Sequence, residues 1–165
     1  SALFDFRTVL GNVMFPMDFL TDWSKAEKEE RARYLLDKVN VKDSEDKYPD
    51  ELSGGMQKRV GIARAIALNP TFLFCDEPNS GLDPETAIVI DHLISSLTKE
   101  LGITTIMNTH DLNSIMEIGD NIGFLYKGEI IWQGDRHSIL SAECPQLREF
   151  LCSNTLARNI IEKSR

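Results

Sequence analysis

Residues 71–108 read TFLFCDEPNSGLDPETAIVIDHLISSLTKELGITTIMN, and they predict a strand, a helix and a second strand in that order. The apolar run Thr71–Cys75 is typical of a strand that is covered on both faces in a parallel sheet. Asp83-Pro84-Glu85 supplies a helix cap, a first-turn proline and an early acid, and the apolar residues behind it keep helical spacing until Gly102. Ile103–Asn108 is again apolar. A strand, a helix and a strand in succession indicate an α/β fold.

The segments before this stretch predict helices. Ser24 caps a charged helix that runs to Val39, with Glu27 as the partner in its capping box. Ser53-Gly54-Gly55 opens a further helix, whose apolar residues fall on one face.

Both ends of the chain look less regular. Residues 3–20 are apolar and aromatic but contain Gly11 and Pro16, so we expect a loop with short helical pieces there. After the second strand the pattern predicts a short helix, and Lys127-Gly128 then indicates a hairpin between two strands. Helical pieces complete the chain, and residues 153–165 are expected to form a tail.

Composition excludes several classes of protein. The chain has 165 residues, 42% hydrophobic and 27% charged, which favours a globular domain over a disordered chain. Its 18 Lys and Arg against 26 Asp and Glu give a net charge of −8, which argues against non-specific binding to nucleic acid or anionic lipid. No apolar stretch is long enough to span a membrane, and the first residues lack the pattern of a signal peptide. The three cysteines have no ligand spacing and predict reduced thiols, not a disulfide frame or a zinc site.

Four local patterns could carry chemistry, and the first is Leu52–Gln57. It places Gly54 and Gly55 beside the hydroxyl of Ser53 at the start of a helix. Backbone amides can approach a ligand closely there, and the first-turn N–H groups and the helix dipole favour an anion. The structural alternative is a helix cap that is merely loosened by glycine.

The other three patterns follow the two predicted strands. Asp76-Glu77 ends the first strand, where α/β sheets bind ligands, so one acid can hold a hydrated Mg²⁺ while the other orients or deprotonates a water. An exposed acidic turn is the alternative. For Ser80–Asp83, helix capping by Asp83 explains the sequence by itself. His110 ends the second strand and is either a structural histidine or a contact to a bound phosphate.

In this order and spacing, the four patterns resemble the second half of an ATP-binding-cassette (ABC) ATPase. Leu52–Gln57 looks like the family signature, with Met56 in the position that is most often Gln. Phe72–Glu77 looks like the Walker B strand, Ser80–Asp83 like the D-loop and His110 like the switch histidine.

The resemblance covers residues 3–140 and implies an incomplete P-loop NTPase fold. It implies a helical signature subdomain at residues 1–70, a partial RecA-like core at 71–152 and a C-terminal tail at 153–165. The sequence of residues 2–16 is most similar to that of ATPases of lipid-trafficking importers of the mammalian-cell-entry type.

The resemblance also implies a mechanism, in which two copies of the ATPase sandwich two ATP molecules with Mg²⁺. Asp76 would hold Mg²⁺ through water, Glu77 would polarise the attacking water and His110 would contact the γ-phosphate. The implied nucleotide-binding residues belong to the signature and the D-loop: Ser53, Gly54, Gly55, Gln57, Ser80 and Asp83.

The implied partners are a second ATPase subunit, forming a homodimer, and an integral membrane permease, but no nucleic acid. The permease would dock on the helical region, where Phe15, Phe19 and Trp23 are candidates. Plain core packing is the alternative for these aromatic residues. The protein would then be cytoplasmic and peripheral on the inner face of the cell membrane.

No Gly-x-x-x-x-Gly-Lys-Ser/Thr motif occurs in the chain, although a P-loop supplies the lysine and the backbone cradle for the β and γ phosphates. We therefore expect the chain to be a fragment of a longer ATPase that is inactive alone. Loss of the P-loop strand would leave an unfilled apolar slot beside the two predicted strands. We expect strand exchange, dimerisation or rearranged packing to close it.

Three functions fit these observations: the ATPase subunit of a membrane transporter, with lipid as a candidate cargo; a soluble, non-transport ABC ATPase acting on ribosomes or DNA; and a P-loop-less regulatory or interaction module. The acidic charge and the absence of a basic patch argue against the second function. The sequence encoded before Ser1 would separate the first function from the third, and a neighbouring permease gene would separate the first from the second.

Overall fold

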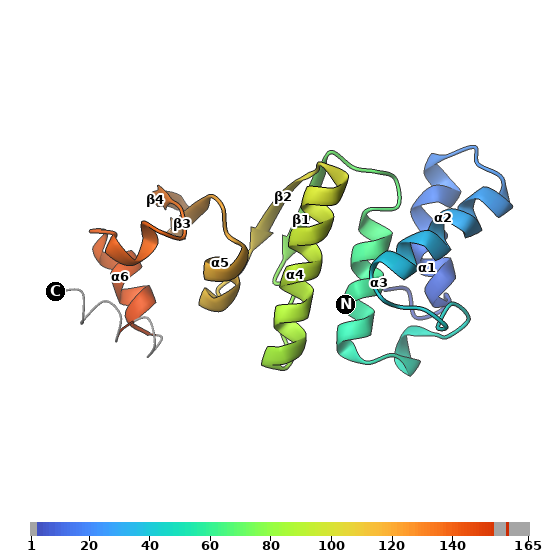
Figure 1. Ribbon diagram of the computed structural model, residues 1–165, viewed down its shortest axis with the longest axis horizontal. Coiled ribbons are helices and arrows are strands. Elements are labelled where there is room, and N and C mark those ends of the chain that lie inside the picture. Colours follow the sequence, from blue (N-terminus) through green and yellow to red (C-terminus); the bar gives the residue numbers. More distant parts are fainter. Residues whose placement is uncertain (1–2, 154–157, 159–165) are drawn as a thin grey trace. The chain divides into compact units, whose positions relative to one another are not determined.

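The computed structural model describes residues 3–153 and residue 158, so nearly all of the expected tail lies outside the described residues. The chain divides into two compact units, Ser1–Asn108 and Thr109–Arg165. The first unit contains the following elements (Figure 1): α1 (Val9–Leu20), α2 (Lys25–Lys38), the 3₁₀ turn η1 (Pro49–Glu51), α3 (Gly54–Ala65), β1 (Phe72–Asp76), α4 (Pro84–Leu101) and β2 (Thr104–Asn108). The second unit contains these: α5 (Leu112–Ile118), β3 (Ile122–Tyr126), β4 (Glu129–Gly134), η2 (Ile139–Ser141) and α6 (Pro145–Cys152).

Local sequence signals explain where several elements begin and end. The predicted capping box of α2 is confirmed, because the Ser24 hydroxyl accepts from the Glu27 N–H while the Glu27 carboxylate accepts from the Ser24 N–H at 2.7 Å. Asp83 caps α4, and the helix ends at Gly102, whose φ of 62° favours glycine. The predicted hairpin is also present as β3 and β4, which pair antiparallel across a turn at Lys127 and Gly128.

Residues 3–8 contain no helix, but residues 9–20 form one continuous helix, α1, so the expectation of a loop with short helical pieces was wrong for residues 9–20. The helix begins after Thr8, whose hydroxyl accepts from the Gly11 N–H at 3.1 Å. Pro16 lies inside the helix, where proline typically costs about 3 kcal/mol. Apolar side chains at every fourth position are fully buried: Val9, Val13 and Met17. Packing this stripe against α2 and α3 offsets the cost of the proline.

The two strands of the first unit pair directly and in parallel, with Phe72 opposite Thr104 and Asp76 opposite Asn108. Within the part of the chain that the structure describes, no third strand joins this sheet. One face packs into the buried cluster shared with α4, but the other exposes Phe72, Phe74 and Ile106. The expectation that this sheet is covered on both faces was therefore wrong for the described residues, which supply a helical layer on one side only. Closure of the apolar slot by strand exchange, dimerisation or rearranged packing stays a prediction.

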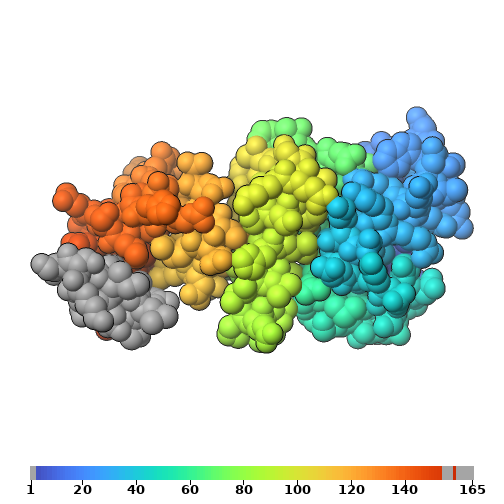
Figure 2. Space-filling view, viewed as in Figure 1, coloured from blue at the N-terminus to red at the C-terminus, as the bar shows by residue number. Residues whose placement is uncertain are grey.

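An ion pair links α2 to the C-terminal end of α4 within the first unit. Lys38 on α2 forms an ion pair with Glu100 on α4, and the surfaces of these two helices meet in the space-filling view (Figure 2). The hydrogen bond to Glu100 raises the pKa of Lys38. Among the described residues, no helix combines the length and the apolar character needed to cross a bilayer.

The second unit has a small core of its own. The Phe124 ring on β3 lies 5.6 Å from the Phe150 ring on α6, and the side chains of Leu147 and Leu151 on α6 are fully buried. A register shift between Phe124 and Leu125 marks a bulge in the hairpin.

Candidate functional site

The tip of α3 carries the first of the four patterns. Ser53 caps the helix, and its hydroxyl accepts from the Met56 N–H at 3.3 Å. The first-turn N–H groups of a helix have no acceptor within the helix, and both Ser53 and Gly54 are exposed. The hydroxyl thus serves as a helix cap, while the backbone amides of the tip are placed where an anion can reach them.

This tip packs against the start of α4. A β-carbon built on Gly54 would lie 3.5 Å from Cδ2 of Leu82, which is ordinary contact. A β-carbon on Gly55 would lie 2.6 Å from Cγ2 of Thr86, so any side chain at position 55 would force Thr86 or the helix to shift. The structure therefore brings the signature-like pattern and the D-loop-like pattern together, and it explains why position 55 is glycine.

Asp83 and Ser80 both have structural partners within the first unit. The Thr86 side chain and backbone N–H bond to the Asp83 carboxylate, with the N–H at 2.9 Å, and these bonds lower the pKa of Asp83. The capping alternative for Asp83 is thus correct. Ser80 is exposed, and its N–H donates to the carbonyl of Glu77 at 3.2 Å. Contact of either residue with a nucleotide stays a prediction.

Asp76 ends β1 with an exposed carboxylate. Its Oδ1 accepts from Nδ2 of Asn108, the residue opposite it on β2, at 2.8 Å. Among the described residues no group of three or more His, Cys, Asp or Glu is arranged to hold a metal ion. A single exposed carboxylate nevertheless fits Mg²⁺ that arrives with phosphate, because Mg²⁺ keeps several waters and takes one or two protein carboxylates. Sequence reasoning missed Asn108, although its place opposite Asp76 follows from pairing the two predicted strands.

Glu77 has an unusual backbone. Its φ of 45° lies in the left-handed region, which is sparsely populated by residues other than glycine. Its N–H donates to the Asn108 carbonyl at 2.9 Å, and its own carbonyl accepts from the Ser80 N–H and from Nζ of Lys58, each at 3.2 Å. Strained backbone of this kind clusters at functional sites.

The loop after Glu77 is fixed by a buried polar pair that sequence reasoning missed. Nδ2 of Asn79 donates to both carboxylate oxygens of Asp91 on α4, at 3.1 and 3.3 Å. Both residues are buried. The available signal was Asp91 itself, a charged residue directly beside Ile90 on the apolar stripe of the predicted helix.

Two predicted site residues have other surroundings. Nε2 of Gln57 donates to the carbonyls of Pro49 at 2.9 Å and Leu52 at 3.3 Å, so this side chain stabilises the turn before α3. Its contact with nucleotide stays a prediction. His110 is exposed and belongs to the second unit, whereas the other predicted site residues belong to the first.

The cysteine beside the site is not a nucleophile. All three cysteines are free, as predicted. Burial raises the pKa of the Cys75 thiol to about 11, so it stays protonated near neutral pH. The roles of Asp76 and Glu77, whose carboxylates lie at the same end of β1, stay a prediction.

The contact between Gly55 and Thr86 makes a testable prediction. We expect Gly55→Ala to destabilise the protein by about 1–3 kcal/mol, because the β-branched Thr86 is held by Asp83 and cannot easily turn its methyl group away. The double variant Gly55→Ala/Thr86→Ser keeps the hydroxyl and removes that methyl group, so it should regain most of the loss. Denaturant unfolding of the three proteins measures both effects.

Gly61→Ala is the matched control, because a β-carbon there meets nothing within 4 Å on the same helix. We expect it to raise stability by about 0.5–1 kcal/mol. A Gly55→Ala protein that is as stable as Gly61→Ala would show that the tip of α3 does not press against α4.

Comparisons with known proteins agree with this arrangement. A family model described as ABC transporter matches residues 1–80. The methionine import ATP-binding proteins MetN of Corynebacterium efficiens and MetN 1 of Shouchella clausii are 40% and 44% identical over 139 and 135 residues. These alignments cover 84% and 82% of this chain but 38% and 39% of the two relatives, so the chain spans about two fifths of their length. The relatives are named as methionine importers, and the narrower resemblance to lipid-trafficking ATPases is not supported.

A solved structure supports the fold. The dimeric ATP-binding cassette MJ0796, in a post-hydrolysis state bound to ADP and Pi, matches with a TM-score of 0.72 and 34% sequence identity. The match covers 82% of this chain and 59% of that chain. The α/β fold expected from the resemblance, a partial P-loop NTPase cassette, is confirmed. With its signature-like helix tip packed against the start of α4, the chain belongs to the ABC transporter ATP-binding family.

Proposed function

We propose that this chain carries the signature and the hydrolytic carboxylate of the ATP-hydrolysing subunit of an ABC importer. The observation that carries the proposal is Glu77, a half-buried carboxylate held in strained backbone at the carboxyl end of β1. The names of the relatives, which are importers, support the direction of transport. The chain has no P-loop motif, so ATP binding would depend on a P-loop outside these residues.

Each predicted site residue would have a separate role in ATP hydrolysis. Glu77 would accept a proton from the attacking water or orient it, as a carboxylate at hydrogen-bonding distance can. Asp76, with Oδ1 held by Asn108, would bind Mg²⁺ through water. Bound Mg²⁺ would neutralise charge that develops on the phosphates. His110 would add a contact to the γ-phosphate.

A second copy of the subunit would complete each nucleotide site. Ser53, Gly54 and Gly55 offer a hydroxyl and first-turn amides at the exposed tip of α3, which suits the γ-phosphate of a nucleotide held by the other copy. Asp83 and Ser80 would link the two sites. The match to a dimeric cassette supports this assembly.

The N-terminal helices offer a surface for a permease on the inner face of the membrane. The Phe15 ring lies 4.5 Å from that of Phe4 and 4.9 Å from that of Phe19, and Phe19 is 69% exposed. Trp23 is exposed and lines a cavity of about 390 Å³ with Arg31 and other α2 residues. Exposed aromatic groups beside a cavity are typical of protein–protein contact sites.

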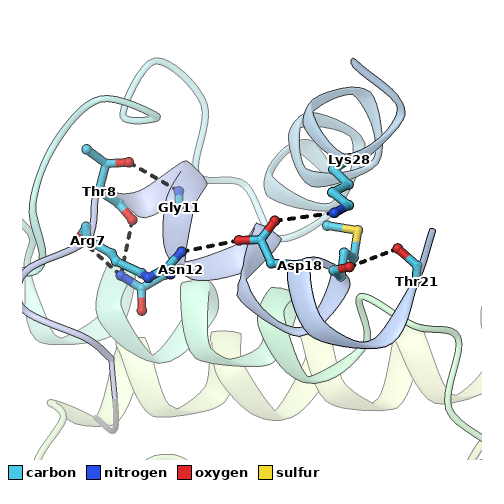
Figure 3. A network of polar contacts seen from close by, with 8 residues as sticks. Arg7, Thr8, Gly11, Asn12, Asp18, Thr21 and Lys28 are labelled. Atoms are coloured by element: carbon cyan, nitrogen blue, oxygen red, sulfur yellow. Dashed lines mark hydrogen bonds and ion pairs between the residues drawn. The ribbon is translucent and has the colours of Figure 1, made fainter. Parts of the chain in front are cut away.

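Polar contacts hold this surface in place (Figure 3). Asp18 of α1 forms ion pairs with Arg7, at 3.3 Å, and with Lys28 of α2, at 3.6 Å. The Arg7 guanidinium also lies over the Phe15 ring, 4.9 Å from its centre. The aromatic surface is therefore preorganised, which lowers the entropic cost of binding a partner.

We expect Phe19→Asp in the full-length subunit to abolish co-purification with the permease while the fold is unchanged, because a charge would replace the most exposed ring of the phenylalanine row on α1. Phe19→Leu is the matched control and should retain the complex. Permease pull-down and circular dichroism measure the two properties. Retention of the complex by Phe19→Asp would place the docking surface elsewhere.

The function itself is tested with the full-length subunit and its permease in lipid vesicles. We expect uptake that requires hydrolysable ATP and Mg²⁺. ATP hydrolysis by the full-length subunit with no permease partner and no uptake would instead favour a non-transport ATPase, and no ATP binding at all would favour a regulatory module.

A further inference from the structure

A lysine side chain of the signature helix, α3, contacts the backbone of Glu77. Lys58 lies in the second turn of α3, half-buried, and its Nζ donates to the Glu77 carbonyl at 3.2 Å. The two residues are 19 positions apart in the sequence. None of the four sequence patterns includes this lysine.

The carbonyl that Lys58 contacts belongs to Glu77, whose backbone conformation must be stabilised by its surroundings. Glu77 has a φ of 45°, and such backbone persists only where its surroundings fix it. Two of its hydrogen bonds come from the strand and the turn next to it: its N–H donates to the Asn108 carbonyl, and its carbonyl accepts from the Ser80 N–H. A further bond, from Lys58, comes from a helix whose tip carries Ser53-Gly54-Gly55.

An ammonium group is a strong donor to a carbonyl, because a charged hydrogen bond is about twice as strong as a neutral one. Turning the Glu77 peptide would break this bond, and moving α3 away would break it too. The orientation of the Glu77 carboxylate is therefore linked to the position of α3.

We propose that Lys58 is a positioning residue that couples the signature helix to Glu77 within one subunit, so that the carboxylate is correctly aimed only when α3 is in place. The inference rests on the proposed function, since it assigns a regulation to the same hydrolytic site. A nucleotide that engages the tip of α3 would thereby also fix the orientation of Glu77. Lys58 touches neither water nor phosphate in this scheme.

The test uses Lys58→Met, with Lys58→Arg as the conservative variant that can still donate and Lys58→Gln as a neutral donor should Lys58→Met not fold. The matched control is Lys38→Met, which breaks the ion pair between α2 and α4 but leaves Glu77 untouched. In the full-length subunit, we expect Lys58→Met to lower kcat for ATP hydrolysis about tenfold with KM unchanged within a factor of about two. Lys58→Arg should restore most of kcat, and Lys38→Met should resemble the wild type.

A second readout does not depend on hydrolysis. In the 165-residue chain, the amide protons of Glu77 and Ser80 should exchange about tenfold faster in Lys58→Met than in Lys38→Met, because their hydrogen bonds flank the released carbonyl. Unchanged exchange would overturn the contact, and faster exchange with unchanged kcat would overturn the coupling. A wild-type subunit that hydrolyses no ATP would instead contradict the proposed function, while the exchange experiment would still report on the link.

Discussion

Replacing Glu77 with Gln in the full-length subunit is expected to lower kcat for ATP hydrolysis by about 10³-fold while leaving ATP affinity unchanged. The amide has nearly the same shape as the carboxylate, so the hydrogen bonds of the strained Glu77 backbone can persist. It cannot accept a proton from water, and loss of a positioned general base typically costs about 10²–10⁴-fold in rate. Single-turnover hydrolysis and equilibrium nucleotide binding measure the two quantities separately.

The matched control is Glu85→Gln, which removes the same charge from an exposed acid in the first turn of α4. We expect that variant to hydrolyse ATP at close to the wild-type rate. If Glu77→Gln also turned over normally, another group would have to activate the water, and the role given to Glu77 would be wrong. Reduced ATP binding by Glu77→Gln would point to a structural role for the carboxylate.

Much of the fold could be predicted because its boundaries are set by local chemistry. Ser24 with Glu27, Asp83 with Pro84, and the turn at Lys127-Gly128 each satisfy backbone groups or fix φ within a few residues. Such signals operate whatever the rest of the chain does. The α/β class followed from them.

The N-terminal helix could not be predicted in the same way. Pro16 argues locally against a helix, and only the burial of Val9, Val13 and Met17 against α2 and α3 outweighs it. A sequence shows the apolar stripe but does not say whether another helix lies beside it.

In the candidate site, too, local patterns could be found in the sequence but long-range contacts could not. The order of Ser53, Asp76, Glu77 and His110 along the chain, through its resemblance to ABC ATPases, predicts a nucleotide site at the end of a sheet, and this site stays a prediction. The contacts that hold these groups join distant positions, such as Lys58 with the Glu77 carbonyl. Such contacts depend on how α3 packs near the end of β1, and a local sequence pattern does not predict which distant residues come into contact.

Asn12 is a buried polar residue that anchors the N-terminal surface. Its side chain is fully buried, and its Nδ2 lies 3.1 Å from the carbonyls of Phe4, Arg7 and Thr8. Its Oδ1 accepts from the Phe4 N–H at 2.9 Å and from the Arg64 guanidinium at 3.3 Å. This one amide therefore fastens the opening segment to α1 and to α3.

We expect Asn12→Leu to lower the free energy of unfolding by about 3–5 kcal/mol, because at least two donors lose a partner in a partly buried place at about 1–3 kcal/mol each. Asn113→Leu, on an exposed position of α5, is the matched control and should change stability by about 0.5 kcal/mol or less. Denaturant unfolding of the two variants makes the comparison, and equal stability of both would show that the network is dispensable.

The variant Asn12→Asp distinguishes the bonds that Oδ1 accepts from those that Nδ2 donates. The carboxylate keeps an acceptor for Phe4 and Arg64 but turns a negative oxygen toward three carbonyls, so we expect a loss close to that of Asn12→Leu despite the nearby guanidinium. A stable Asn12→Asp protein would mean that the pairing with Arg64 dominates and that the three carbonyl contacts matter little. If both variants lose stability as expected, the row of rings formed by Phe4, Phe15 and Phe19 should lose order with them, because the Asn12 side chain bonds to both the N–H and the carbonyl of Phe4. Binding of the permease would then fall with stability in both variants, whereas Phe19→Asp would lose binding at full stability.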